Sequence, residues 1–249
     1  MTRRCIAGLV LLLAASAQAQ NPPLRVAASN GVKAVIEELV PKAESTIGRR
    51  LVVEYNTTTA LKQKIDAGEV FDVAILTTDG LDDLIKAGKI TAATRAEFAR
   101  SGIGVGSRVG APIPDIRTSE ALKQTLLKAK SITYAEDGAS KVHILKMLDR
   151  FGITAEIGRK TDLEQGSTRS TARVADGRTE LVLTLVSEIL PAPGVQLVGP
   201  FPADVQSYIS FAAGIGKNSK NVDAGQALIR FLKSPAVAPA LKTKGMEPQ

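Results

Sequence analysis

Apolar and polar positions alternate with two different periods along residues 24–100. Leu24 to Ala28 is a short apolar run that predicts a strand, and an apolar stripe at helical spacing from Val32 to Val40 predicts a helix after it. Pro41 should kink or interrupt this helix, because proline lacks the backbone N–H that an interior helix position donates. Gly48 is expected to end it.

The strand-then-helix pattern repeats before residue 100. Leu51 to Tyr55 and Phe71 to Leu76 are the next apolar runs. Helical segments follow them, from about Ala60 to Ala67 and from Asp79 onward. This spacing is typical of a mainly parallel sheet covered by helices. Such sheets bind ligands outside the carboxyl ends of their strands, where the helices begin.

A second unit of the same kind opens with an expected strand from Gly102 to Ser107. The further expected elements are helices at 118–128, 140–151 and 168–175 and strands at 131–134, 181–186 and 208–213. We therefore predict an α/β fold of two lobes, each a mainly parallel sheet flanked by helices, with a cleft between them. The predicted lobes are residues 20–100 and 101–216, and the C-terminal helices of residues 217–249 return to the first lobe.

Residues 1–19 have the features of a secretory signal peptide. Arg3-Arg4 precedes an apolar run from Ile6 to Ala15, and Ala17-Gln18-Ala19 is the small-x-small pattern that signal peptidase cuts. The run of about ten residues is too short to span a bilayer as a permanent helix. Cleavage before Gln20 also removes Cys5, the single cysteine, so we expect an exported chain without thiols, disulfides or cysteine metal ligands.

Composition narrows the classes of function. The formal net charge is +7, and Arg3-Arg4 of the signal contributes two of these charges, which leaves +5. Basic residues are scattered among acidic ones, whereas a nucleic-acid surface needs a clustered patch. We expect a soluble monomer with no nucleic-acid partner and some preference for acidic ligands. With no tryptophan and three tyrosines, the chain does not favour a cleft that stacks on sugars.

The sequence offers little for catalysis or for a cofactor. His143, the sole histidine, falls inside a predicted helix, where a packed or solvated role outweighs a catalytic one. No Ser-His-Asp arrangement can be built without it, and no G-x-S-x-G elbow is present. There is no phosphate-binding glycine loop. One histidine and one cysteine are too few to build a metal site from such ligands. We expect no cofactor and no metal.

Small hydroxyl residues and glycines lie at four predicted strand-to-helix junctions. A helix N-terminus has unpaired N–H groups and a partial positive charge, so hydroxyls there suit an oxyanion. The same residues are good N-caps, which explains each single junction without a ligand. All strand-to-helix ends of a parallel sheet point the same way. A ligand cleft shared by the four junctions is therefore as good an explanation as four separate N-caps. The junctions are residues 28–31, 56–59, 137–140 and 166–168.

Two details of these junctions bear on the ligand. Thr57 can close the preceding strand and Thr59 can cap the following helix with no ligand present, which leaves Thr58 unexplained. Arg169 lies at the start of the helix predicted from Thr168. It either belongs to an exposed face or turns into the cleft, where its guanidinium would suit a carboxylate.

Five segments carry a family resemblance through their order and spacing. They are "LRVAASNG", "TTTALKQKIDAGEVFDVAIL", "LLKAKSITYAEDGAS", "VSEILPAPGVQLVGPFPADVQSYISFAAGI" and "ALIRFLKSPAVAPALKTKGMEP". Through them, nearly the whole exported chain resembles the periplasmic molybdate-binding proteins and the wider group of ABC-transporter solute-binding proteins. The resemblance implies the type II periplasmic-binding-protein fold, a periplasmic location, a small anionic ligand and an ABC permease in the inner membrane as partner.

The resemblance also implies the chemistry of the site. Family members hold a tetrahedral oxyanion between the lobes with neutral hydroxyls and main-chain N–H groups, which need not be deionised when the cleft closes. The implied roles, matched by position, are hydroxyl donors at Ser29 and Thr58, N–H donors at Ala139 and Ser140, a main-chain contact at Thr184 and a cleft tyrosine at Tyr208. The sequence departs from the family at Asn30, at Thr57 to Thr59, where Thr58 replaces the usual serine, and at Lys141. With these changes and Arg169, the candidate ligand-binding residues are Ser29, Asn30, Thr57, Thr58, Ala139, Ser140, Arg169, Thr184 and Tyr208.

An enzyme on the same scaffold, aconitate isomerase, is similar around "YAEDGAS" and "VSEILPAPGVQLVG". This alternative requires a general base near the carbon that loses its proton. Nearness to these loops gives Glu136, Asp137, His143 and Glu188 as candidate bases. The sequence thus predicts a solute-binding component that performs no chemistry, with a periplasmic tricarboxylate isomerase as the alternative.

Overall fold

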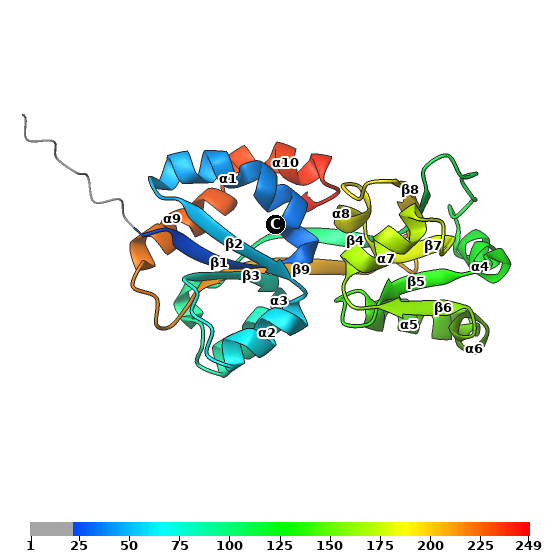
Figure 1. Cartoon of the computed structure of the whole chain (residues 1–249), viewed down its shortest axis with the longest axis horizontal. Coiled ribbons are helices and arrows are strands. Elements are labelled where there is room, and N and C mark those ends of the chain that lie inside the picture. Colours follow the sequence, from blue (N-terminus) through cyan, green and yellow to red (C-terminus); the bar gives the residue numbers. More distant parts are fainter. Residues whose placement is uncertain (1–21) are drawn as a thin grey trace, which may run out of the picture.

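A computed structural model describes residues 22–249, so the predicted signal peptide lies outside the described residues. Figure 1 shows two α/β lobes side by side along the longest axis of the molecule. Helices flank the strands in each lobe, which confirms the predicted α/β class.

The first lobe is built on three parallel strands. Its elements are β1 (Leu24–Ser29), α1 (Lys33–Ile47), β2 (Leu51–Asn56), α2 (Thr58–Asp66), β3 (Val73–Thr77), α3 (Thr78–Lys86), α9 (Val222–Leu232), α10 (Ala238–Thr243) and β10 (Glu247–Pro248). β1 lies between β2 and β3 and is parallel to both. In Figure 1, α1, α9 and α10 cover one face of these strands and α2 and α3 cover the other.

The second lobe repeats this plan on a smaller sheet. Its elements are α4 (Ser119–Lys128), β5 (Ile132–Ala135), α5 (Lys141–Arg150), α6 (Thr154–Gly158), β6 (Thr161–Glu164), α7 (Ser167–Ala175), β7 (Leu181–Leu185), α8 (Val186–Ile189) and β8 (Val195–Pro200). β5 is parallel to both β6 and β7. The apolar pattern does not indicate β6, because Leu163 is its one apolar side chain and is exposed.

Two antiparallel strands connect the lobes, β4 (Ala96–Arg108) and β9 (Tyr208–Ile215). The first half of β4 pairs with β9, and its second half pairs with β7 and β8. The strand order within residues 22–249 is β2-β1-β3-β9-β4-β7-β5-β6, with β8 and β10 each on β4. The strand expected from Gly102 begins at Ala96 instead, because the charged Glu97 and Arg100 interrupt the apolar pattern while their backbones pair with β9.

Helix α1 runs through Pro41 without the interruption that the sequence predicted. The missing N–H of Pro41 leaves the carbonyl of Glu37 without its helical partner. Both residues lie on the exposed side of α1, where water can bond to that carbonyl. Gly48 ends the helix with φ of 64°, as predicted.

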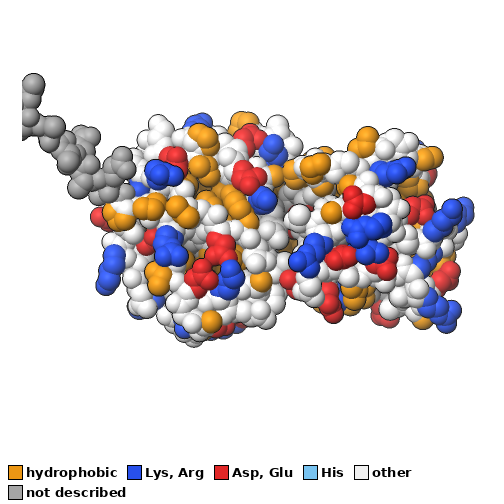
Figure 2. Space-filling view, viewed as in Figure 1, with side chains coloured by type: hydrophobic (Ala, Val, Ile, Leu, Met, Phe, Trp, Pro, Cys, Tyr) orange, Lys and Arg blue, Asp and Glu red, His pale blue; other side chains and the backbone are white. Residues whose placement is uncertain are grey.

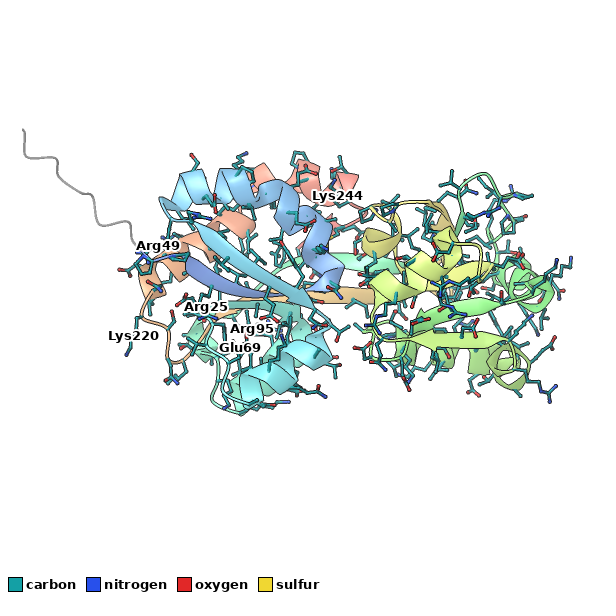
Figure 3. The ribbon with its side chains drawn as sticks, in the orientation of Figure 1. Arg25, Arg49, Glu69, Arg95, Lys220 and Lys244 are labelled. Atoms are coloured by element: carbon teal, nitrogen blue, oxygen red, sulfur yellow. The ribbon has the colours of Figure 1, made fainter. Side chains whose placement is uncertain are left out.

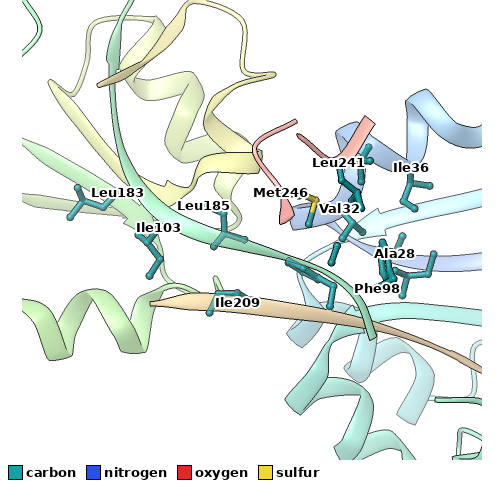
Figure 4. Close-up of a cluster of buried hydrophobic side chains, with 14 of the residues drawn as sticks. Ala28, Val32, Ile36, Phe98, Ile103, Leu183, Leu185, Ile209, Leu241 and Met246 are labelled. Carbon is teal, nitrogen blue, oxygen red and sulfur yellow. The ribbon is translucent and has the colours of Figure 1, made fainter. Parts of the chain in front are cut away.

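Buried apolar side chains form one cluster across the junction of the lobes (Figure 4). Val32 after β1, Ile103 on β4 and Leu185 on β7 all belong to it. Packing is tight at this point, since a Cβ added at Gly31 would lie 2.4 Å from Cζ of Phe211. Substitution of Gly31 therefore requires Phe211 to move.

The outer surface carries charges of both signs. Figure 2 shows basic and acidic side chains interspersed over both lobes on the face in view. Lys244, the residue after α10, forms an ion pair with Glu38 on α1, with 2.9 Å between Nζ and Oε2 (Figure 3). Within residues 22–249, no helix combines the length and hydrophobicity needed to cross a membrane.

Candidate functional site

A cavity of about 310 Å³, including space open to solvent, lies between the two lobes. Each of the four junctions identified in the sequence contributes at least one residue to its wall. The lining residues are Ser29, Asn30, Gly31, Thr57, Thr58, Gly138, Ala139, Ser167, Leu185, Glu188 and Phe211. The cavity therefore lies where strands end and helices begin in both lobes.

Helices begin beside this cavity in both lobes. The first N–H groups of a helix have no intrahelical partner and carry a partial positive charge. In the first lobe this helix is α2, and in the second lobe α5 and α7 begin at or next to lining residues. The surroundings therefore suit a negatively charged group.

Thr57 is the N-cap of α2. Its Oγ1 accepts a hydrogen bond from the N–H of Ala60 at 3.2 Å and donates to Oδ2 of Asp137 at 2.8 Å. The prediction that Thr59 caps this helix is wrong, because β2 ends at Asn56 and Thr57 takes the cap position. The hydroxyl of Thr59 donates to the carbonyl of Asp137 at 3.5 Å. Both threonines are thus engaged within the protein.

Thr58 differs from its two neighbours in its hydrogen bonding. Its Oγ1 accepts from the N–H of Thr77 at 3.3 Å, and it donates to no other residue among those described. Its methyl group lies over Gly80, where an added Cβ would be 2.2 Å from Cγ2 of Thr58. These two contacts fix the side chain and leave its hydroxyl proton for a ligand.

Asp137 bridges the lobes. Besides the bond from Thr57, it accepts a hydrogen bond at Oδ1 from the N–H of Gly166, before α7, at 2.8 Å. A second contact between the lobes is the bond from the Ser187 hydroxyl to the carbonyl of Gly31, at 2.8 Å. The lobes are therefore in direct hydrogen-bonded contact at two places beside the cavity.

Glu188 on α8 places a carboxyl group on the cavity wall. Its Oε1 accepts from the hydroxyl of Ser167 at 2.7 Å, and its Oε2 accepts from the hydroxyl of Thr184 and from the N–H of Leu185, the latter at 3.4 Å. Burial raises the pKa of Glu188 above its ordinary value. The bonds from Thr184 and Ser167 lower this pKa in part, and the nearby Asp137 adds a smaller increase. An acid with a raised pKa thus stands among the neutral donors.

Five of the nine candidate residues line the cavity: Ser29, Asn30, Thr57, Thr58 and Ala139. Ser29 and Thr57 are almost fully buried, with 5% and 6% of their surface exposed. Two further candidates lie behind the wall, because Ser140 is buried at the start of α5 and the Thr184 hydroxyl is bonded to Glu188.

Arg169 and Tyr208 lie outside the cavity lining. Arg169 is exposed on α7. It lies two positions after the lining residue Ser167, which corresponds to a rotation of about 200° around the helix axis, so the two side chains are on different faces of α7. Tyr208 is exposed at the start of β9, and the guanidinium carbon of Arg100 lies 4.3 Å from its ring centroid. Neither side chain adds a charge or a hydroxyl to the cavity in this arrangement.

The candidate bases separate in the same way. Glu188 lines the cavity and Asp137 lies beside it, whereas Glu136 is exposed and accepts a bond from Gln165 at 2.9 Å. His143 on α5 is not among the lining residues, and burial together with Lys146 lowers its pKa.

Sequence reasoning had not selected six lining residues as ligand-binding. Ser167 lies in a junction that the pattern singled out, so its position alone could have added it. Glu188 was selected only as a candidate base. Gly31 and Gly138 also lie in such junctions, whereas Leu185 and Phe211 line the cavity with apolar side chains, for which the sequence gives no signal.

Two α/β lobes joined by crossing strands, with a cavity between them, are the architecture of a two-lobed binding protein. The chain belongs to the family of bacterial extracellular solute-binding proteins, whose family model matches residues 24–247. This membership confirms the family resemblance read from the sequence.

Individual relatives differ in what their names say. The chain is 29% identical to an aconitate isomerase from a Pseudomonas species, over 97% of this chain and 94% of that protein. It is 25% identical to the molybdate-binding protein ModA of Azotobacter vinelandii, over 94% and 92%. The solved structure of the periplasmic molybdate-binding protein of Azotobacter vinelandii matches with a TM-score of 0.73 at 16% identity, covering 90% of this chain and 98% of that one. This likeness confirms the predicted type II periplasmic-binding-protein fold.

Proposed function

We propose that the protein binds a small anion between its lobes as the solute-binding component of an ABC transporter. The observation that supports this most is the cavity itself, where hydroxyls and helix N-termini of both lobes meet. A ligand in this position contacts both lobes at once, so its binding favours the closed arrangement. A permease can then distinguish the loaded protein from the empty one by its shape.

The ligand classes in this proposal are tetrahedral oxyanions and carboxylates. A molybdate-binding relative supports the first class, and the relative named for aconitate, a tricarboxylate, supports the second. Thermal-shift assays and calorimetry against molybdate, tungstate, sulfate, phosphate and di- and tricarboxylates test the proposal. We expect one class to bind with a micromolar or tighter Kd. Absence of binding by all of them would overturn the proposed function.

Location in the periplasm is part of the proposal. It rests on the predicted signal peptide of residues 1–19 and on the periplasmic relatives. Mass spectrometry of the protein from a periplasmic fraction should give a mature chain that begins at Gln20. A full-length chain confined to the cytoplasm would contradict it.

A second candidate function, isomerisation of a tricarboxylate, is favoured by the carboxyl groups of Glu188 and Asp137 at the cavity. Moving the double bond of aconitate requires removal of a proton from the carbon next to it and return of a proton at the far end of the three-carbon system. Deprotonated Glu188 can accept that proton and then return it. Incubation with trans-aconitate, followed by chromatography for the cis isomer, separates the two functions. Turnover that is lost in Glu188→Gln would establish the enzyme, and binding without turnover would exclude it.

A further inference from the structure

The carboxyl of Glu188 lies on a wall that two spaces share. A groove of about 630 Å³, including space open to solvent, lies between α1 and the segment after α8. Asn30, Ser167 and Glu188 line both this groove and the cavity between the lobes. A ligand that fills the cavity or extends into the groove therefore meets this carboxyl.

The hydrogen bonds of Glu188 leave room for a ligand. A carboxylate has about four acceptor positions. Thr184 and Leu185 occupy those of Oε2, and Ser167 occupies one position of Oε1. One acceptor position of Oε1 is left on a side chain that lines the cavity.

No positive charge neutralises this carboxyl among the described residues. Glu188 forms no ion pair there, and Asp137, the acid whose charge raises its pKa, already accepts bonds from Thr57 and Gly166. The charged side chains on the neighbouring elements α1 and α7 either pair with other residues or are exposed. Lys33 and Glu37 on α1 line the groove and pair with each other at 3.8 Å, Arg173 on α7 pairs with Asp162 and Glu164, and Arg169 is exposed.

We propose that Glu188 and the bound ligand share one proton, so that the site selects carboxylic and hydroxy acids over oxyanions that stay fully deprotonated. Two negative groups in a poorly hydrated cavity repel each other, whereas one proton between them makes a charge-assisted hydrogen bond. Two carboxyls that share one proton are a known arrangement in aspartic proteases. The raised pKa of Glu188 agrees with this, because it makes the uptake of a proton easier. The inference rests on the proposed function, since it assumes that an anion binds in the cavity.

Calorimetry in two buffers of different ionisation enthalpy measures the proton directly. The probes are trans-aconitate and citrate on one side and molybdate and sulfate on the other. We expect trans-aconitate to bind with uptake of about one proton near pH 7, and its affinity to fall about tenfold per pH unit above the pKa values involved. Molybdate and sulfate should bind at least ~100-fold more weakly, because their oxygens are less basic than the last carboxylates of citrate and trans-aconitate to ionise and hold a shared proton less readily.

Glu188→Gln tests the assignment to this residue. This variant should bind trans-aconitate without proton uptake. Its affinities for the carboxylic acids and for the oxyanions should also differ less than those of the unmodified protein. Glu136→Gln makes the same change on an exposed acid outside the cavity lining. It should leave the proton uptake and the difference in affinity unchanged. The uptake measured on the unmodified protein keeps the inference testable even if Glu188→Gln does not fold.

The outcomes separate the inference from the proposed function. Tight binding of molybdate or sulfate without proton uptake would overturn the inference and leave the proposed function standing. Proton uptake that persists in Glu188→Gln would overturn it as well. Absence of binding by these probes and by the other anions of the screen would overturn the proposed function itself.

Discussion

Individual side chains at the cavity have separate tasks even when they are neighbours of one type. Thr57 caps α2 and bonds to Asp137, Thr59 bonds to the same loop, and Thr58 keeps a free hydroxyl proton. Residue type and spacing led to Thr58, but they gave the wrong threonine as the cap. The difference arises because the end of β2 decides which residue starts the helix, and a run of three similar residues does not show that end.

Thr58→Ala should weaken ligand binding by about 1–3 kcal/mol, the scale of a lost hydrogen bond to a charged group. Its unfolding free energy should change much less, because the residue is only partly buried. Calorimetry with the ligand found in the screen provides the measurement. Thr46→Ala, on an exposed position of α1, is the matched control and should leave affinity unchanged. An unaltered affinity in Thr58→Ala would show that its hydroxyl does not bind the ligand.

Glu188 should make stability depend on pH in a definite direction. Because its folded pKa is raised, the folded state holds the proton more tightly than the unfolded state does. This stabilisation is fully present below the ordinary pKa of 4.5 and is lost as the pH rises through the folded value. The unfolding free energy of the unmodified protein, relative to Glu188→Gln, should therefore fall as the pH rises above 4.5. Urea titrations of both proteins across this range provide the test, and a constant difference would contradict it.

At the scale of elements, one buried acid holds the returning C-terminal segment against the first lobe. Asp72, before β3, accepts hydrogen bonds from the N–H of Arg25 at 2.9 Å, from the hydroxyl of Ser219 at 2.6 Å and from the amide of Asn221 at 3.0 Å. Asn221 in turn accepts from Arg49 after α1. Figure 3 labels Arg25 and Arg49 on this side of the lobe. Strand β1, the loop after α1 and the start of α9 are thereby tied to one carboxylate.

Asp72→Asn should lower the unfolding free energy near pH 7 by about 1–3 kcal/mol, since it weakens three bonds to a buried charge. Burial raises the pKa of Asp72, but the bonds from Ser219, Arg25 and Asn221 together lower it below its ordinary value. Its stabilising effect is therefore present above 3.8 and is lost as the pH falls through the folded value.

Urea denaturation at several pH values measures this loss. Asp66→Asn, on an exposed position near the end of α2, is the control and should change stability by less than about 0.5 kcal/mol. If both variants lose equal stability, the tie through Asp72 has no special role.

Sequence patterns predicted most elements because their apolar residues face the buried clusters of the two lobes. The patterns missed α6, α8, β8, β10, the start of β4 and the whole of β6. In the last two, the strand pairs through its backbone while charged or exposed side chains hide the apolar pattern. The helix break expected at Pro41 is absent for a related reason. The destabilisation by a proline inside a helix depends on whether the carbonyl that loses its partner, here that of Glu37, can bond to water. Exposure of that kind is a tertiary property.

At the scale of the whole molecule, the cavity exists only because two lobes meet. The sequence predicted its junctions, since strand-to-helix ends follow from the order of the elements. It could not place Arg169 or Tyr208, because the rotation of α7 and the path of β9 between the lobes decide where those side chains lie. For the same reason, the sequence could not show that the carboxyl of Glu188 lies among the hydroxyl donors.

Asp137→Ala should shift the ligand-free protein toward an open arrangement. It removes the bond from Thr57 across the cleft and leaves the N–H of Gly166 without its acceptor. Small-angle X-ray scattering without ligand should therefore give a larger radius of gyration than for the unmodified protein. Asp149→Ala, on an exposed position of α5, should give no change. Equal radii for all three proteins would show that this bond does not hold the lobes together.

The two crossing strands have a consequence for how such proteins can be recombined. The chain enters the second lobe on β4 and leaves it on β9, and these strands are paired at Gly102 and Tyr208. The second lobe is thus an insertion whose two ends lie side by side. Exchange of this lobe between family members needs only two cuts on neighbouring strands. Each exchange would replace the half of the cavity that holds Glu188 and keep the half that holds Thr58.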